Sequence, residues 1–362
     1  MLADRGKISN RQAIALLLAA LVSPSLRFIP SYTSKYARFA AWVAPAFAAI
    51  FMFILVSILA QFFQKYKEAS LMDVIYKITG GFIGRILVNC YCLWFLLLAS
   101  LYTRYYAEGI VSSIMPNTSL GLFIGFMLLT VTLALHMGLV TFTRVAEILF
   151  PIFLVVYMIV SIFLFPSIKI EHILPVSYID TLPILHASMG ILSIWGYMVC
   201  IYFLGDRINN KENLKKEGFR NVFLQMIRII ILLLVVVGTI GPNVSSRSSL
   251  PFFLAAKYVS VFGVLERVES IVMSVWILSD FILITFFSYL VLAALKSICK
   301  LQDIKNLIHP LMILILFLSL YLANAKFELL NLSSYFIVPL DLIFEFLIPL
   351  LLMVLGKVRK IL

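Results

Sequence analysis

Long apolar stretches follow one another along the whole chain, and short polar segments separate them. A helix that crosses a membrane needs about 20 largely apolar residues, and ten stretches meet this criterion. Only a helix satisfies its own backbone hydrogen bonds in hydrocarbon, so the pattern predicts an all-α membrane protein with about ten transmembrane helices. We expect one transmembrane domain over residues 1–362, with spans at 11–30, 41–63, 84–107, 118–137, 142–165, 182–204, 221–241, 267–294, 307–324 and 335–356.

Composition and charge agree with a chain that is embedded in a lipid bilayer. Hydrophobic residues make up 63% of the chain and charged residues only 13%, about half the usual charged share of a soluble domain. The net charge of +12 does not indicate nucleic-acid binding, because the lysines and arginines lie in short clusters between the apolar stretches. Most of these cations fall on one side if both termini are cytoplasmic, which is therefore the predicted orientation. The first external loop, with Arg27, Lys35 and Arg38, is the exception.

Two spans contain residues that interrupt a helix near the middle of the bilayer. Ten spans divide into two repeats of five, at about 11–165 and 182–356, and transporters with inverted repeats bind solutes where corresponding helices break. The first span contains Ser23, Pro24 and Ser25, and proline removes a backbone donor. The sixth contains Gly190, Ser193, Trp195, Gly196 and Tyr197. The matched pair favours a binding site for a small charged solute, although Pro and Gly also serve helix packing in membranes.

Three carboxyl groups lie inside predicted spans, where an ionised side chain is costly. Asp280 lies in span eight, and Asp341 and Glu345 stand one turn apart in span ten. All three are candidates for an ion or proton site, with a structural hydrogen bond or a contact with a partner subunit as alternatives. Because no phosphate loop, metal-binding motif or nucleophile triad is apparent, we expect no enzymatic activity, no metal site and no cofactor.

Several short motifs together resemble one known family. Gly263, Glu266, Arg267, Glu269 and Ser270 precede Trp276 and Phe281, and this pattern resembles the B subunits of spore germinant receptors. These subunits belong to the amino acid–polyamine–organocation transporter superfamily. Supporting motifs begin at Ile8, Trp42 and Thr143, so the resemblance covers essentially the whole chain.

The resemblance implies a leucine-transporter-like fold, with a 5+5 inverted repeat and discontinuous helices 1 and 6. It also implies residence in the spore inner membrane beside an A-type membrane subunit and a C-type lipoprotein subunit. The B subunit is thought to recognise small germinants, often amino acids. Carried onto this sequence, the family's pocket between spans one, three, six and eight corresponds to Ser23, Pro24, Ser25, Tyr91, Phe95, Ser193, Trp195, Gly196, Tyr197, Thr285 and Tyr289.

The sequence therefore favours a germinant-receptor subunit that binds a small molecule in a midplane pocket and signals to partner subunits. A secondary amino-acid transporter coupled to Na⁺ or H⁺ is the first alternative, because one fold serves both functions. A scaffold subunit that assembles a membrane complex and binds nothing itself is the second.

Overall fold

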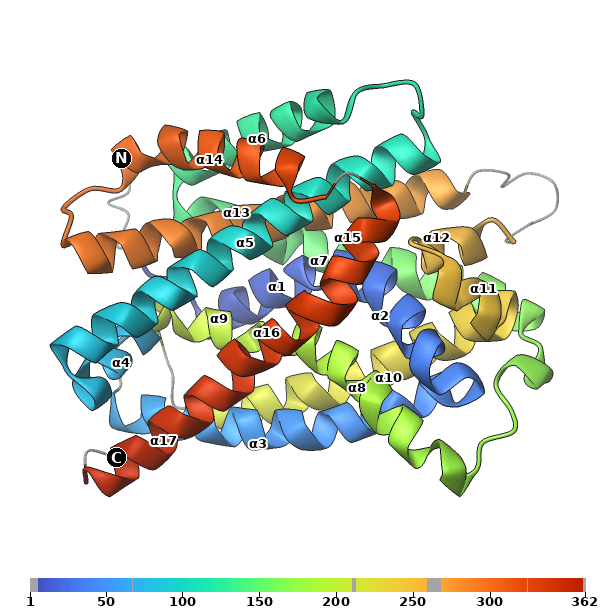
Figure 1. The fold of residues 1–362 in the computed structure, drawn as a ribbon, viewed down its shortest axis with the longest axis horizontal. Coiled ribbons are helices and arrows are strands. Elements are labelled where there is room, and N and C mark those ends of the chain that lie inside the picture. Colours follow the sequence, from blue (N-terminus) through green and yellow to red (C-terminus); the bar gives the residue numbers. More distant parts are fainter. Residues whose placement is uncertain (1–5, 67, 210–212, 259–267, 324, 361–362) are drawn as a thin grey trace.

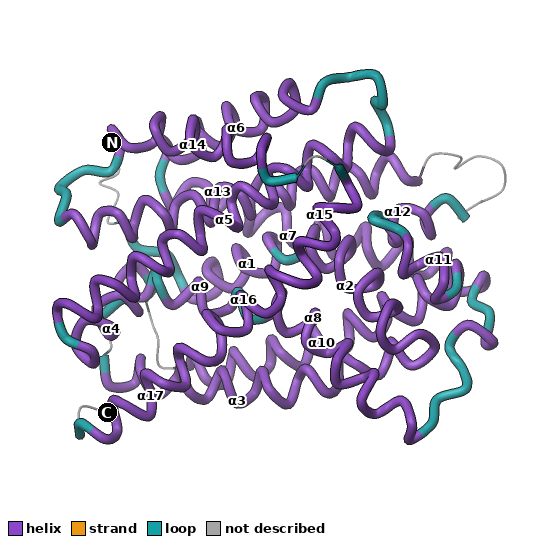
Figure 2. The backbone as a smooth tube through the Cα atoms, viewed as in Figure 1, coloured by secondary structure: helices purple, strands orange, loops and turns teal. Residues whose placement is uncertain are grey.

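Each predicted span corresponds to a helix, or to a set of consecutive helices, in the computed structural model, which describes all residues except 1–5, 67, 210–212, 259–267, 324 and 361–362. The long helices run roughly side by side, with α6 and α14 at one edge and α3 at the other (Figures 1 and 2). The spans are, in chain order, α1 (Asn10–Ala20) with α2 (Val22–Ala37), α3 (Ala44–Lys65), α5 (Gly81–Ser113), α6 (Leu120–Met137), α7 (Leu139–Leu164), α8 (Thr181–Trp195) with α9 (Met198–Tyr202), α10 (Leu214–Ile240), α13 (Val268–Cys299), α14 (Ile308–Tyr321), and α15 (Lys326–Leu332) with α16 (Val338–Leu342) and α17 (Ile348–Val358).

The outer surface of this bundle is apolar, as lipid contact requires. Within the described residues, 8 helical stretches are long and apolar enough to cross a membrane, and the shorter apolar helix at Lys305–Tyr321 corresponds to the predicted ninth span. Large apolar side chains such as Phe126, Ile148 and Phe317 are exposed on it. Since a soluble surface does not carry so many contiguous apolar groups, the chain is an integral membrane protein.

The first span breaks at Leu21, three residues before the expected position. Helix α1 ends at Ala20 and α2 starts at Val22, so Pro24 occupies the first turn of α2. Proline is tolerated there because the backbone N–H groups of a first helical turn have no partner inside the helix. The proline therefore starts a new helix rather than opening the middle of an existing one.

The sixth span breaks at Gly196 and Tyr197, between α8 and α9. Helix α8 continues without interruption through Gly190, whose missing side chain makes room for the ring of Tyr32 on α2. Glycine serves close packing at position 190 and the break lies at position 196, so the two glycines of this span have different roles.

The last span contains two π-helical turns that the sequence analysis did not predict. They cover Ser333–Ile337 and Ile343–Leu347 and lie on either side of α16. A proline follows each one, Pro339 at the start of α16 and Pro349 at the start of α17. Because proline has no N–H for the carbonyl four residues earlier, the local hydrogen bonding shifts in register. Single π turns are frequent at functional sites.

Short elements cover both ends of the bundle. One of them is α4 (Leu71–Thr79), which starts with a capping box between Ser70 and Asp73. On the predicted cytoplasmic side, the backbone of Ile8 pairs with Arg207 and Asn209. On the opposite side lie the two short helices α11 (Pro242–Arg247) and α12 (Pro251–Ala256). The motif residues at 263–267 lie outside the described residues.

Candidate functional site

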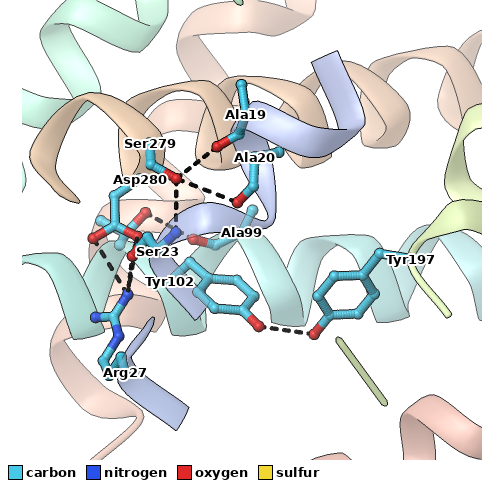
Figure 3. Close-up of polar contacts among 10 residues, drawn as sticks. Ala19, Ala20, Ser23, Arg27, Ala99, Tyr102, Tyr197, Ser279 and Asp280 are labelled. Atoms are coloured by element: carbon cyan, nitrogen blue, oxygen red, sulfur yellow. Dashed lines mark hydrogen bonds and ion pairs between the residues drawn. The ribbon is translucent and has the colours of Figure 1, made fainter. Parts of the chain in front are cut away.

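A buried ion pair joins the first span to the eighth. Arg27 Nη2 lies 2.9 Å from Asp280 Oδ1, and the two side chains are each only 3% exposed. Ser23 Oγ donates to the same carboxylate oxygen across 2.5 Å and accepts from Arg27 Nη2 across 2.6 Å (Figure 3). The prediction that Arg27 lies in an external loop is wrong, because the residue is buried inside α2. The fixed positive charge of Arg27 is the partner that a buried carboxylate needs, so Asp280 is one half of an ion pair rather than an open ion site.

The neighbouring residue Ser279 forms hydrogen bonds with two backbone groups at the break in span one. Its hydroxyl accepts a hydrogen bond from the Ser23 N–H across 2.8 Å and donates one to the Ala19 carbonyl across 2.7 Å (Figure 3). In an unbroken helix these two backbone groups would bond to each other. The inserted hydroxyl therefore satisfies both of these backbone groups.

A small cavity lies beside this network, between α2, α5, α8 and the last span. Its volume is about 20 Å³, about the room that one water molecule needs. Four of the predicted site residues line it, namely Pro24, Ser193, Tyr197 and Asp341. The other lining residues are Arg27, Phe28, Leu101, Tyr102, Tyr105, Ile194, Leu330, Ser333, Ile337 and Val338.

A chain of hydrogen bonds fixes one wall of the cavity. The Tyr197 hydroxyl donates to Asp341 Oδ2 across 3.2 Å and lies 2.9 Å from the Tyr102 hydroxyl. The two rings approach each other from α5 and from the break in span six (Figure 3). Trp94 Nε1 donates to the second oxygen, Asp341 Oδ1, across 2.8 Å. Two neutral donors hold this carboxylate in place without neutralising its charge.

The cavity therefore has a cationic residue and an anionic residue in its lining. The Arg27 guanidinium lies 4.7 Å from the ring centroid of Tyr105 and 4.9 Å from that of Trp276, which hold it by cation–π contact. Its Nη1 atom is buried and has no hydrogen-bond partner among the described residues. A free donor on an arginine suits a carboxylate, and the Asp341 carboxylate suits an ammonium group. The arrangement fits a small zwitterion.

Glu345 lies next to this wall, at the break in span six. Its side chain is fully buried, and neither carboxyl oxygen has a hydrogen-bond partner among the described residues. One of these oxygens occupies the space that a side chain at position 196 would need. Glycine at the break is thus required by a close approach from span ten.

Several predicted site residues lie away from the cavity. The break residue Ser23 belongs to the Asp280 network, while Ser25 borders a smaller cavity with Arg228. The Thr285 hydroxyl bonds to the Phe281 carbonyl of its own helix, and Tyr289 lines a separate pocket at the other end of the bundle. The remaining three, Tyr91, Phe95 and Trp195, are buried without lining the cavity; Tyr91 and Phe95 also pack in an aromatic cluster with Trp94 and Phe203.

Four polar residues of the lining were not predicted from the sequence: Arg27, Tyr102, Tyr105 and Ser333. A signal for two of them was present, because Tyr102, Tyr105 and Tyr106 form an unusual cluster of hydroxyl groups inside an apolar span. That span is 33 residues long. Because of this length, the sequence alone does not show which turn of the span lies level with the breaks. The predicted residues Tyr91 and Phe95 lie about three turns before Tyr102 and Tyr105.

Known proteins resemble this chain over almost its full length. A family model described as "Spore germination protein" matches residues 7–327. Spore germination protein KB of Bacillus subtilis (strain 168) is 21% identical over 363 residues, which cover 99% of this chain and 96% of that protein. Spore germination protein A2 of the same organism is 25% identical, with 80% of each chain covered.

Solved structures with the same fold share little sequence with this chain. The crystal structure of MhsT in complex with L-phenylalanine superposes with a TM-score of 0.72 at 12% identity, covering 97% of this chain and 98% of MhsT. The substrate-bound structure of a Na⁺-coupled sialic acid symporter gives a TM-score of 0.66 at 11% identity, covering 94% and 79% of the two chains. These likenesses confirm the predicted leucine-transporter-like fold.

Proposed function

Because the chain belongs to the family of spore germination proteins, we propose that it is a subunit of a nutrient-germinant receptor that binds a small zwitterion, an amino acid, between its broken helices. The observation that carries this proposal is the cavity lined by both Arg27 and Asp341. A free guanidinium donor for the ligand carboxylate and a buried carboxylate for its ammonium group are the two contacts that distinguish an amino acid from an apolar solute.

The structure describes a closed form, in which the cavity is too small for an amino acid. Ligand pockets usually have volumes of about 300 Å³ or more, whereas this cavity has about 20 Å³. The Arg27–Asp280 ion pair ties span one to span eight, and Ser245 on α11 donates to the Pro30 carbonyl across 3.1 Å at the predicted external side. Binding therefore requires the surrounding helices to separate.

The last span is the element best suited to move. It supplies Ser333, Ile337, Val338 and Asp341 to the cavity, and its two π turns interrupt regular hydrogen bonding on either side of Asp341. A ligand that binds the open form better than the closed form shifts the equilibrium between them. We propose that partner subunits detect this shift, so that the chain acts as a sensor and not as an enzyme.

The partners in this proposal are an A-type membrane subunit and a C-type lipoprotein subunit. The proposed location is the spore inner membrane, with both termini in the cytoplasm, as the distribution of lysine and arginine favours. The wide apolar surface around α6, α7 and α14 provides area both for lipid and for a second membrane protein.

Binding and uptake, measured on the purified full-length chain in lipid vesicles, test the proposal. We expect saturable binding of at least one radiolabelled amino acid without its accumulation in the vesicles. Accumulation driven by a Na⁺ or proton gradient would instead show a transporter. A scaffold subunit would bind no amino acid, and spores that carry Tyr197→Phe or Asp341→Asn would then germinate with unchanged nutrient sensitivity.

A further inference from the structure

Two carboxyl groups of the last span are buried together and are not paired with a cation among the described residues. Asp341 is 1% exposed and Glu345 is 0% exposed. Among the described residues, no salt bridge includes either group. Asp341 receives hydrogen bonds from Trp94 and Tyr197, but neither oxygen of Glu345 has a hydrogen-bond partner in the part of the chain that the structure describes. An ionised carboxylate in such a place costs several kcal/mol.

The groups that surround Glu345 are neutral or acidic. The described titratable side chains close enough to interact with its charge are Tyr91 on α5, Tyr197 at the break, Cys200 on α9 and Asp341 in the same span. None of them supplies a positive charge, and Arg27, which borders the same cavity as Asp341, forms its ion pair with Asp280 instead. Two ionised carboxylates one turn apart also repel each other, so burial and repulsion both require that this pair bind a positive charge.

The space around the pair determines whether it can bind a metal ion or a proton. Asp341 borders the cavity of about 20 Å³, and Glu345 is not among the residues that line it. Instead, a Glu345 oxygen is packed directly against Gly196. A metal ion needs room and several oxygen ligands around it. A proton needs neither, because it is held by a covalent bond to one carboxyl oxygen.

We propose that Asp341 and Glu345 form a proton-binding site at the break in span six, which holds one proton in the closed form and releases it when the break opens. On opening, the carboxyl O–H bond breaks and the proton passes to water that enters the cavity. The negative charge that remains at Asp341 then faces the ammonium group of a bound solute. Only this last step rests on the proposed function; the protonated closed form does not.

Infrared spectroscopy of the full-length chain in lipid nanodiscs, at neutral pH and without any germinant, tests the site. We expect the C=O stretch of a neutral carboxyl group in a sodium-free buffer, unchanged when Na⁺ or K⁺ is added. Glu345→Gln should remove this band. Asp341 then stays ionised, because two hydrogen bonds hold its carboxylate and no second carboxylate repels it. The control Glu171→Gln, at an exposed position in a short 3-10 helix, should leave it intact.

Three results would overturn the proposal. The first is a wild-type spectrum without a neutral carboxyl band. The second is a band that disappears when Na⁺ or K⁺ is added, which would show an alkali-ion site. The third is a band that persists in both Glu345→Gln and Asp341→Asn and so belongs to other residues. The wild-type spectrum alone decides the first two, so the test holds even if a variant folds poorly.

Discussion

The Ser279 hydroxyl donates a hydrogen bond to the Ala19 carbonyl across 2.7 Å and so joins span eight to the broken first span. Because the same hydroxyl accepts from the Ser23 N–H, Ser279→Ala leaves two buried backbone groups unpaired. Each such group costs about 1–3 kcal/mol. We expect the free energy of unfolding in detergent to fall by about 2 kcal/mol or more.

Ser274→Ala is the matched control on the same helix. Ser274 is exposed and, among the described residues, its hydroxyl bonds to the Ser270 carbonyl one turn earlier. The control should change the free energy of unfolding by less than about 0.5 kcal/mol. Equal effects of the two variants would show that Ser279 does not support the break.

A second prediction concerns the ion pair between Arg27 and Asp280. Asp280→Ala leaves a buried guanidinium without its counter-charge, which costs about 3–5 kcal/mol. Replacing both residues by apolar ones of similar size, Arg27→Met with Asp280→Leu, should recover most of that stability. Thermal unfolding of the single and double variants measures the difference. If the double variant loses as much stability as the single variants Arg27→Met and Asp280→Leu lose together, the two residues do not stabilise each other.

The close approach of Glu345 to Gly196 gives a third prediction. In Gly196→Ala the new methyl group collides with the Glu345 carboxyl, and overpacking of this kind costs about 1–3 kcal/mol. Shortening the facing side chain in Gly196→Ala with Glu345→Ala should restore part of the loss, as thermal unfolding would show. If Gly196→Ala alone unfolds at the wild-type temperature, span ten does not press on the break.

The Tyr197 hydroxyl gives a fourth prediction, on ligand binding. Tyr197→Phe removes a hydrogen bond to the charged Asp341 and the contact with the Tyr102 hydroxyl. Since a hydrogen bond to a charged group contributes about 1.5–3 kcal/mol, we expect amino-acid affinity to fall about tenfold or more. Equilibrium binding to the vesicle-embedded protein measures this. The control Tyr178→Phe, at a side chain that is 88% exposed, should bind as wild type does.

The sequence predicted the fold well because each membrane span is a local property of the chain. About 20 apolar residues form one helix wherever they occur, and the two broken spans were recognised from residues inside them. The break in span one nevertheless lies at Leu21 and not at Pro24. Proline fits the first turn of a helix, so its position indicates where the second half starts.

The candidate site was harder to predict because it depends on contacts between distant spans. Arg27 and Asp280 are separated by 253 positions, and no local pattern pairs them. Charge counting assigned Arg27 to a loop because arginine is rare inside membranes, whereas its partner on α13 makes burial possible. Similarly, the role of span ten arises from how α16 packs against α8, which periodicity within one helix does not reveal.

The two-charge recognition of a zwitterion is the central claim, and competition binding tests it most directly. Each amino acid that binds the vesicle-embedded protein is compared with the amine that lacks its carboxylate and with the acid that lacks its ammonium group. We predict that both analogues bind about tenfold more weakly or worse, because each loses one charged contact. Analogues that compete as well as the amino acid, or the absence of binding by any amino acid, would contradict the claim.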